Sequence, residues 1–368
     1  MPSQPKRILS FDGGGIRGIF SLQIAARIEQ LFREEYGQPH LVLSDVYDLF
    51  AGTSTGAIIA ASLAWGTPVA DIEALYTSRG KQMFAHQRPY LPWRRLKSKY
   101  RAEAIAEFFR ERFIEDDGTP ALLGSAKLRK TLLVVMRNAT TGAPWPISNN
   151  PHALYNDPSL ANSNLQIPIW QLLRASTAAP TFFPPEAITL GSEHFLFVDG
   201  AVTPYNNPAL LAVLMATLPP YRMEWPTGRD ALHLTSVGTG GSRAHLRKRM
   251  ANQTYVWDAL RFVIPALLDD ASIHQDMMCR VLGNCLHGAT LDSEIGALES
   301  PSLLPAAEQK FSYLRYNCML DSTDVGNPLT PTELQIDDLH AVERLQAIGM
   351  ACAARDVKRA HLFGRASA

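Results

Sequence analysis

The sequence predicts an α/β protein with a mostly parallel central sheet. Short apolar runs, typical of buried parallel strands, alternate along the chain with longer segments of helical periodicity. Two of these strands pass directly into a helix through a glycine-rich turn. The length of 368 residues suits one large α/β domain. We therefore expect a single domain over residues 1–368, with a motif-bearing core at about 6–242 and a mostly helical part at about 243–368.

The first glycine-rich turn lies between a strand and a helix. Residues 7–11 form a short apolar run, and residues 19–36 place their apolar side chains on one helical face. Between these segments stands the sequence DGGGIRG at 12–18. A glycine loop at the start of a helix directs backbone N–H groups toward a ligand at the edge of the sheet. This loop is therefore a candidate site for binding negative charge.

The glycine loop fits two kinds of site. Gly13, Gly15 and Gly18 match the fingerprint of a dinucleotide-binding oxidoreductase. The same loop could supply the oxyanion hole of a serine hydrolase. Dinucleotide binding requires an acidic residue at the end of the next strand, but the next apolar run, 46–51, ends at a second glycine turn. The hydrolase interpretation uses both turns and is preferred, and dinucleotide binding stays as an alternative.

The second glycine turn, GTSTG at 52–56, has the pattern of a nucleophile elbow. Ser54 lies between Gly52 and Gly56, after an apolar strand and before an apolar helix at 57–65. Glycine is needed on both sides because the turn is sharp, and a side chain there would collide with the neighbouring strand or helix. Such a turn lifts the serine hydroxyl clear of the sheet. The alternative is an ordinary Ser/Thr turn that caps the helix.

A serine nucleophile needs a base within hydrogen-bond reach. Asp199 closes a short apolar strand at 195–198 and is followed by a glycine. Of the later histidines, only His233 lies in a predicted strand, and none stands in a recognisable catalytic loop. We therefore favour a Ser54–Asp199 dyad in which the carboxylate is the general base. Burial would raise its pKa from the usual value of about 3.9. A triad that uses a histidine is the alternative.

Together, three segments resemble the patatin-like phospholipase family. The resemblance rests on DGGGIRG at 12–18, GTSTG at 52–56 and Asp199-Gly200-Ala201, in the family's order. It implies a three-layer α/β/α sandwich and metal-independent hydrolysis of lipid acyl esters by a Ser/Asp dyad. Carried onto this chain, the resemblance implies Ser54 as nucleophile, Asp199 as base, and an oxyanion hole of Gly13, Gly14 and Gly15 with Arg17 close to it.

The resemblance also suggests a biological role. Some bacterial proteins that this chain resembles are effectors of anti-phage defence, which a cyclic oligonucleotide activates to degrade membrane phospholipid. We therefore expect phospholipid as the substrate, a cyclic oligonucleotide as a candidate activator, and a cytoplasmic protein that contacts the inner membrane peripherally when active. Self-association into a homo-oligomer is a further candidate interaction. A carboxylesterase or lipase without nucleotide control and a catalytically silent interaction protein are the alternatives.

A strongly basic segment stands apart from these motifs. Residues 79–101 carry eight basic side chains and no acidic one, interleaved with Tyr90, Trp93 and Tyr100. The plain interpretation is a solvated loop. The alternative is a surface for phospholipid headgroups or nucleotide phosphates, where cations meet phosphate and aromatic rings lie at headgroup depth. The candidates for this surface are Arg88, Arg94, Arg95, Lys97, Lys99 and Arg101.

Composition limits the remaining possibilities. The chain has 35 basic and 35 acidic residues, so no global field would attract DNA or RNA. Its 4 cysteines form no CxxC pair, and we expect no metal, disulfide framework or cofactor. The polar first residues lead into a strand, so no signal peptide is expected. Residues 138–168 are expected to form an irregular excursion, and 232–237 to form the last strand.

Overall fold

The computed structural model describes residues 4–83, 100, 103–241, 256–299, 302–322, 328–330, 333–335 and 337–364, and for 79–83 and 256–265 only the backbone. Within these residues, one 9-stranded sheet has the order β5-β6-β3-β2-β1-β7-β9-β8, and β4 also pairs with β3. The strands are β1 (Lys6–Phe11), β2 (Leu49–Thr53), β3 (Thr131–Asn138), β4 (Ala143–Ser148), β5 (Glu186–Leu190), β6 (Glu193–Asp199), β7 (Leu232–Val237), β8 (Asn284–His287) and β9 (Ser312–Tyr316). The helices are α1 (Gly18–Tyr36), α2 (Thr55–Ala64), α3 (Val69–Met83), α4 (Glu103–Arg112), α5 (Ile169–Ser176), α6 (Ala209–Thr217), α7 (Val256–Leu282), α8 (Val342–Asp356) and α9 (Arg359–Phe363).

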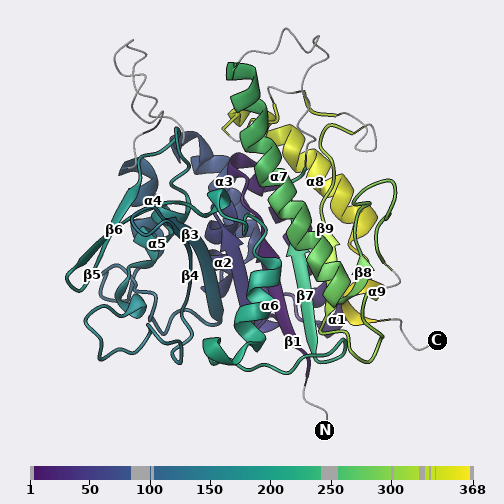
Figure 1. Cartoon of the computed structure of the whole chain (residues 1–368), viewed down its shortest axis with the longest axis horizontal. Coiled ribbons are helices and arrows are strands. Elements are labelled where there is room, and N and C mark those ends of the chain that lie inside the picture. Colours follow the sequence, from purple (N-terminus) through teal and green to yellow (C-terminus); the bar gives the residue numbers. More distant parts are fainter. Residues whose placement is uncertain are drawn as a thin grey trace.

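Helices cover both faces of this sheet, so the protein has three layers (Figure 1). Successive residues of a strand point to opposite faces. Ile8 packs in one hydrophobic core with residues of α6 and α7, whereas Leu9 packs in another with residues of α1, α2 and α8. The central pairs β1–β2, β1–β7, β2–β3 and β7–β9 are parallel. The predicted α/β class, mostly parallel sheet and three layers are confirmed.

Two strands approach each other along one edge of β3. β2 runs parallel to the first part of β3 and ends with Thr53 opposite Val135. β6 runs antiparallel to the last part of β3 and ends with Asp199 opposite Met136. β4 pairs along residues 133–138 and so occupies the opposite edge. β2 and β6 therefore share an edge and run toward each other, and this register places the end of β6 beside the turn that follows β2.

Two expectations from the sequence are wrong. The segment 138–168, expected to be irregular, contains β4, in which Pro144 and Pro146 resemble the breakers of a loop. Proline is tolerated there because β4, in the described part of the chain, pairs only with β3, and an edge strand has backbone positions that need no donor. Residues 232–237 form β7 but not the last strand, because β8 and β9 follow it and extend the same sheet.

The helical C-terminal part is present as expected, with α7, α8 and α9. Helix ends follow local rules as well: α1 stops at Gly37, whose left-handed φ of 62° lets its N–H bond back to the Arg33 carbonyl. No helix among the described residues is long and apolar enough to cross a bilayer. The candidates for the basic surface lie outside the described residues: Arg88, Arg94, Arg95, Lys97, Lys99 and Arg101.

Candidate functional site

Ser54 occupies a strained turn between β2 and α2. Its φ of 55° and ψ of −123° are rare for a residue that carries a side chain. A Cβ at Gly52 would lie 2.1 Å from the carbonyl oxygen of Gly56, and a Cβ at Gly56 would lie 2.3 Å from that of Phe11. Both positions therefore require glycine, because β1, β2 and α2 approach each other so closely. This is the strand–turn–helix geometry of a nucleophile elbow.

A hydrogen bond joins Ser54 to Asp199. Ser54 Oγ donates to Asp199 Oδ2 at 2.7 Å, and Asp199 Oδ1 accepts from the Ala201 backbone N–H at 2.7 Å. Gly200 lets this turn approach β3, since a Cβ there would lie 2.3 Å from a β3 carbonyl oxygen. Burial raises the pKa of Asp199 to about 6, although the bonds from Ala201 and Ser54 and the charge of Arg174 act to lower it. A carboxylate with this pKa is a stronger proton acceptor than one in water.

The end of α5 holds both partners in place. The Ser54 backbone N–H donates to Ser176 Oγ at 2.9 Å, and Ser176 Oγ donates to the Val135 carbonyl at 2.7 Å. The Asp199 backbone N–H donates to the Ala178 carbonyl at 3.0 Å. Sequence reasoning missed Ser176, because a lone serine at the end of a helix gives no distinctive signal. Its place in the site depends on how α5 lies against β3.

The glycine loop lies beside Ser54. A Cβ at Gly13 would be 3.3 Å from the Ser54 Cβ. The Gly13 N–H donates to the Asn206 carbonyl at 3.0 Å and is therefore engaged. The N–H groups of Gly14 and Gly15 have no acceptor among the described residues, and Gly15 has a left-handed φ of 59°. Of the three glycines expected to form an oxyanion hole, Gly14 and Gly15 are thus the ones whose donors no described group engages.

Arg17 ties the glycine loop to the segment after β7. Its Nη1 donates to the Gly240 carbonyl at 3.2 Å, and its Nε donates to the Gly14 carbonyl at 3.5 Å. Burial lowers the pKa of Arg17, while the charge of Asp269 on α7 acts to raise it. The guanidinium therefore fixes the backbone of the loop from the side that faces α7.

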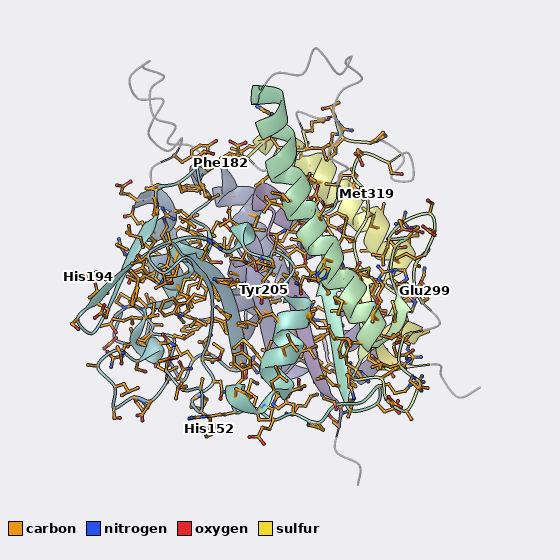
Figure 2. The ribbon with its side chains drawn as sticks, viewed as in Figure 1. His152, Phe182, His194, Tyr205, Glu299 and Met319 are labelled. Carbon is orange, nitrogen blue, oxygen red and sulfur yellow. The ribbon has the colours of Figure 1, made fainter. Side chains whose placement is uncertain are left out.

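The segment before α6 joins the two turns. Thr53 Oγ1 donates to the Tyr205 carbonyl at 2.6 Å, and Tyr205 is half-buried and lies near the centre of the view in Figure 2. The next residue, Asn206, accepts from Gly13 through its carbonyl and donates from Nδ2 to Ser272 Oγ of α7 at 3.1 Å. The elbow, the glycine loop and α7 are thereby connected through two consecutive residues.

A histidine base is not found at Ser54 in the described part of the chain. His233 of β7 lies opposite Arg7, four strand positions before the end of β1 where the glycine loop begins. Four positions correspond to about 13 Å. The Ser54 hydroxyl instead donates to the carboxylate described above. Two histidines of this sequence, His86 and His245, lie outside the described residues. The geometry favours the dyad over the triad.

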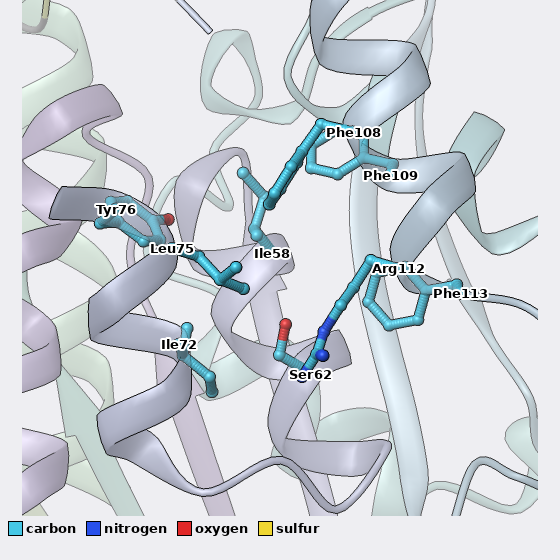
Figure 3. A pocket seen from close by; sticks show the side chains of 9 residues that line it. All are labelled: Ile58, Ser62, Ile72, Leu75, Tyr76, Phe108, Phe109, Arg112 and Phe113. Carbon is cyan, nitrogen blue, oxygen red and sulfur yellow. The ribbon is translucent and has the colours of Figure 1, made fainter. Parts of the chain in front are cut away.

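An apolar pocket lies beside the elbow helix, between α2, α3 and α4 (Figure 3). Ile58 of α2 follows Ser54 by one helical turn and lies between Tyr76 of α3 and Phe108 of α4 (Figure 3). The Tyr76 hydroxyl donates to the Thr55 carbonyl at 3.3 Å, which fixes α3 to the start of α2. The pocket is lined by Ile58, Ser62, Ile72, Leu75, Tyr76, Phe108, Phe109, Arg112 and Phe113.

In the described part of the chain, the residues needed for a metal site, a disulfide or a dinucleotide site are not brought together. No group of three or more His, Cys, Asp or Glu side chains there is placed to hold a metal ion. The four cysteines are free thiols and all are buried. The strand next to β1 ends at the Ser54 turn, where a dinucleotide site would need an acidic residue.

Comparisons with known proteins bear on the family of this chain. A family model described as "Patatin-like phospholipase" matches residues 9–213. Patatin-17 of Solanum cardiophyllum is 28% identical over 285 residues, which cover 72% of this chain and 69% of that protein. The cGAMP-activated phospholipase of Escherichia coli (strain TW11681) is 24% identical, with 77% of each chain covered. The cGAMP-activated phospholipase of Vibrio cholerae is 27% identical, with 76% of this chain and 81% of that protein covered.

Proposed function

This chain belongs to the patatin-like phospholipase family, and we propose that it cleaves fatty-acyl esters of membrane phospholipids with Ser54 as nucleophile and Asp199 as general base. The family makes it a lipid acyl hydrolase and leaves no support for a dinucleotide-binding oxidoreductase. One observation carries the assignment of the residues: Ser54 Oγ donates to a buried carboxylate at 2.7 Å from a strained turn.

The proposed reaction has two halves. Asp199 accepts the hydroxyl proton of Ser54 while Oγ attacks the ester carbonyl carbon, and the N–H groups of Gly14 and Gly15 donate to the carbonyl oxygen as it becomes negative. The bond to the alcohol oxygen then breaks, and the alcohol leaves with the proton from Asp199. Water attacks the acyl-enzyme and gives a proton to Asp199. Release of the fatty acid returns that proton to Ser54.

The apolar pocket between α2, α3 and α4 has an open volume of only about 10 Å³, so its assignment to the acyl chain requires these helices to move apart when lipid enters. Its walls are formed almost entirely by aliphatic and aromatic side chains, and α2, which carries Ile58, begins directly after Ser54. Hydrocarbon is stabilised by leaving water for such a surface. A chain that enters beside Ile58 keeps its ester carbonyl close to the start of α2, where Ser54 lies.

Activation by a cyclic oligonucleotide is the less direct part of the proposal. Two relatives from bacteria carry the name cGAMP-activated phospholipase, at 24% and 27% identity. We place the enzyme in the cytoplasm and in peripheral contact with the inner membrane when active. The basic segment 79–101 is assigned to this contact, because each cation near an anionic bilayer surface contributes about 1 kcal/mol.

One experiment tests the reaction and the activator together. The purified protein is incubated with mixed phospholipid vesicles, with and without cyclic dinucleotides, and the products are identified by mass spectrometry. We expect fatty acid and lysophospholipid from the wild type, more of both with the activating nucleotide, and neither from Ser54→Ala. Cleavage of soluble short-chain esters alone, unaffected by any nucleotide, would favour a general carboxylesterase. Full activity of Ser54→Ala would contradict the assignment of the nucleophile.

A further inference from the structure

The glycine loop begins at Asp12, which forms a buried ion pair with Arg315 from a distant part of the chain. Asp12 directly follows β1 and directly precedes Gly13. Arg315 of β9 donates two hydrogen bonds to the Asp12 carboxylate, from Nη1 to Oδ1 at 2.9 Å and from Nη2 to Oδ2 at 2.6 Å. The same Nη1 donates to Ser236 Oγ of β7 at 2.8 Å. The Arg315 side chain therefore crosses β7 to reach the start of the loop.

This ion pair belongs to a balanced network of four buried charges. Asp276 of α7 lies 4.0 Å from Arg315 Nε and accepts from the Tyr313 hydroxyl at 3.0 Å. Arg280 donates to both carboxylate oxygens of Asp276, at 2.8 and 2.7 Å. The four charged residues are between 1% and 7% exposed. The charge of Asp12 and its hydrogen bonds raise the pKa of Arg315, although burial alone would lower it. Arg315 is therefore held in its charged form.

A glycine loop needs such an anchor because glycine has little conformational preference of its own. The donors assigned to the oxyanion hole, Gly14 and Gly15, follow Asp12 by two and three residues. The Gly13 carbonyl is held by Thr239 Oγ1 at 3.0 Å, and the Asp12 backbone N–H donates to Val237 at 3.1 Å. These bonds fix the backbone at its start. In the described part of the chain, the Asp12 side chain is held by the two hydrogen bonds from Arg315.

We propose that Arg315 is a positioning residue, which clamps Asp12 and so aligns the N–H donors of Gly14 and Gly15 with the reacting ester. The inference rests on the proposed function. It extends that function beyond residues 9–213, the range that the family model matches, because Arg315 lies in the C-terminal part. The oxyanion hole is then incomplete without β9, and α7 supports the clamp through Asp276.

The test separates alignment from simple stability. Arg315→Met leaves Asp12 as an unpaired buried charge and should destabilise the fold, whereas the double variant Asp12→Asn with Arg315→Met removes both charges and should recover much of that stability. The kcat of the double variant should nevertheless stay roughly 10- to 100-fold below wild type on a soluble short-chain ester, with KM changed little. Arg359→Met, which removes an exposed arginine paired with Glu35, is the control and should keep wild-type kcat.

Amide hydrogen exchange provides a readout that does not need activity. The amides of Asp12 and Gly13 are hydrogen-bonded to Val237 and Asn206, and they should exchange faster in the double variant while the other sheet amides do not. Recovery of wild-type kcat together with stability, or unchanged exchange at these two amides, would overturn the clamp. If wild-type protein cleaves no ester, the proposed function fails, and faster exchange in the double variant would still establish the clamp as an anchor of the loop.

Discussion

The two ends of the parallel sheet bury titratable groups in similar ways but differ in what surrounds them. At the end where β1 and β2 finish, burial raises the pKa of Asp199 to about 6. At the other end, burial together with the charge of Arg7 lowers the pKa of His233 to about 4. Burial thus favours the neutral form at both ends. A shifted pKa by itself therefore does not distinguish a reactive site from a packed histidine.

Contacts make the distinction instead. Asp199 accepts a hydrogen bond from Ser54, a residue with strained φ, and Ser54 lies beside the glycine loop. At the opposite end, His233 shares a small pocket with His361, which stacks on His287 with ring centroids 4.9 Å apart. That end offers aromatic packing and no strained nucleophile among its described residues. A reactive centre needs the partner and the strain together.

The largest effect should come from removing the nucleophile. Ser54→Ala should lower fatty-acid release by a factor of about 10⁴ or more, because it removes the hydroxyl that we propose as the nucleophile. His233→Ala, at the other end of the sheet, should leave the rate near wild type. Both are measured on the same phospholipid vesicles. If His233→Ala loses as much activity as Ser54→Ala, the reactive centre is not confined to the end of the sheet that carries Ser54.

The next largest effect concerns the base. Asp199→Asn should lower kcat by about 10²- to 10⁴-fold, since the amide cannot accept the serine proton.

The same variant, Asp199→Asn, should be more stable than the wild type at neutral pH. The folded-state pKa of about 6 lies above the ordinary value of 3.8, so ionisation of Asp199 destabilises the fold as the pH rises from about 4 to 6. The shift corresponds to about 3 kcal/mol.

Urea unfolding at two pH values measures that destabilisation. Asp199→Asn should gain up to about 3 kcal/mol relative to wild type at pH 8, and the gain should build up between pH 4 and 6 and vanish below it. A difference between Asp199→Asn and wild type that is equal at both pH values would show that burial does not raise the pKa of Asp199.

A smaller effect is expected from the glycine loop. Gly15→Ala should lower kcat by roughly 100-fold, the usual scale for one oxyanion donor, because alanine resists the left-handed φ of 59°. Gly37→Ala is a matched control, since Gly37 has a φ of 62° and open space around it. Both variants should lose similar stability, and only Gly15→Ala should lose kcat. Normal kcat with a raised KM would mean that the loop binds substrate without stabilising the transition state.

The smallest effect should come from the apolar pocket. Leu75 lines it from α3, and Leu75→Trp would occupy space that we assign to the acyl chain. The ratio of kcat/KM for long-chain over short-chain esters should fall by about 10-fold. An unchanged ratio would place the acyl chain elsewhere and leave the catalytic residues unaffected.

How much of this molecule could be predicted from its sequence depends on how local each requirement is. The turn at Ser54 could be predicted because Gly52 and Gly56 are required by contacts within one strand–turn–helix unit. Asp199 could be singled out because it closes an apolar strand before a glycine. The α/β class follows from periodicities that are likewise local.

Other features depend on pairing between distant segments. β9 was missed because its sequence SYLRY contains an arginine, which resembles an exposed position until Asp12 is seen beside it. β4 was missed because its prolines are acceptable only at an edge. The carbonyl of Asn206 matters only because the chain before α6 passes over the glycine loop. No pattern within a short window reports such neighbours.

The central claim is that a carboxylate at one end of the sheet, and no histidine, activates Ser54. The most direct test is the pH dependence of the rate at which a fluorophosphonate labels Ser54. In the wild type the rate should fall tenfold per pH unit below about pH 6 and level off above it, because ionised Asp199 is the reactive form. His233→Ala and the other single His→Ala variants should keep this midpoint, and Asp199→Asn should lose it. A midpoint that survives in Asp199→Asn but disappears in one histidine variant would contradict the dyad and establish a triad.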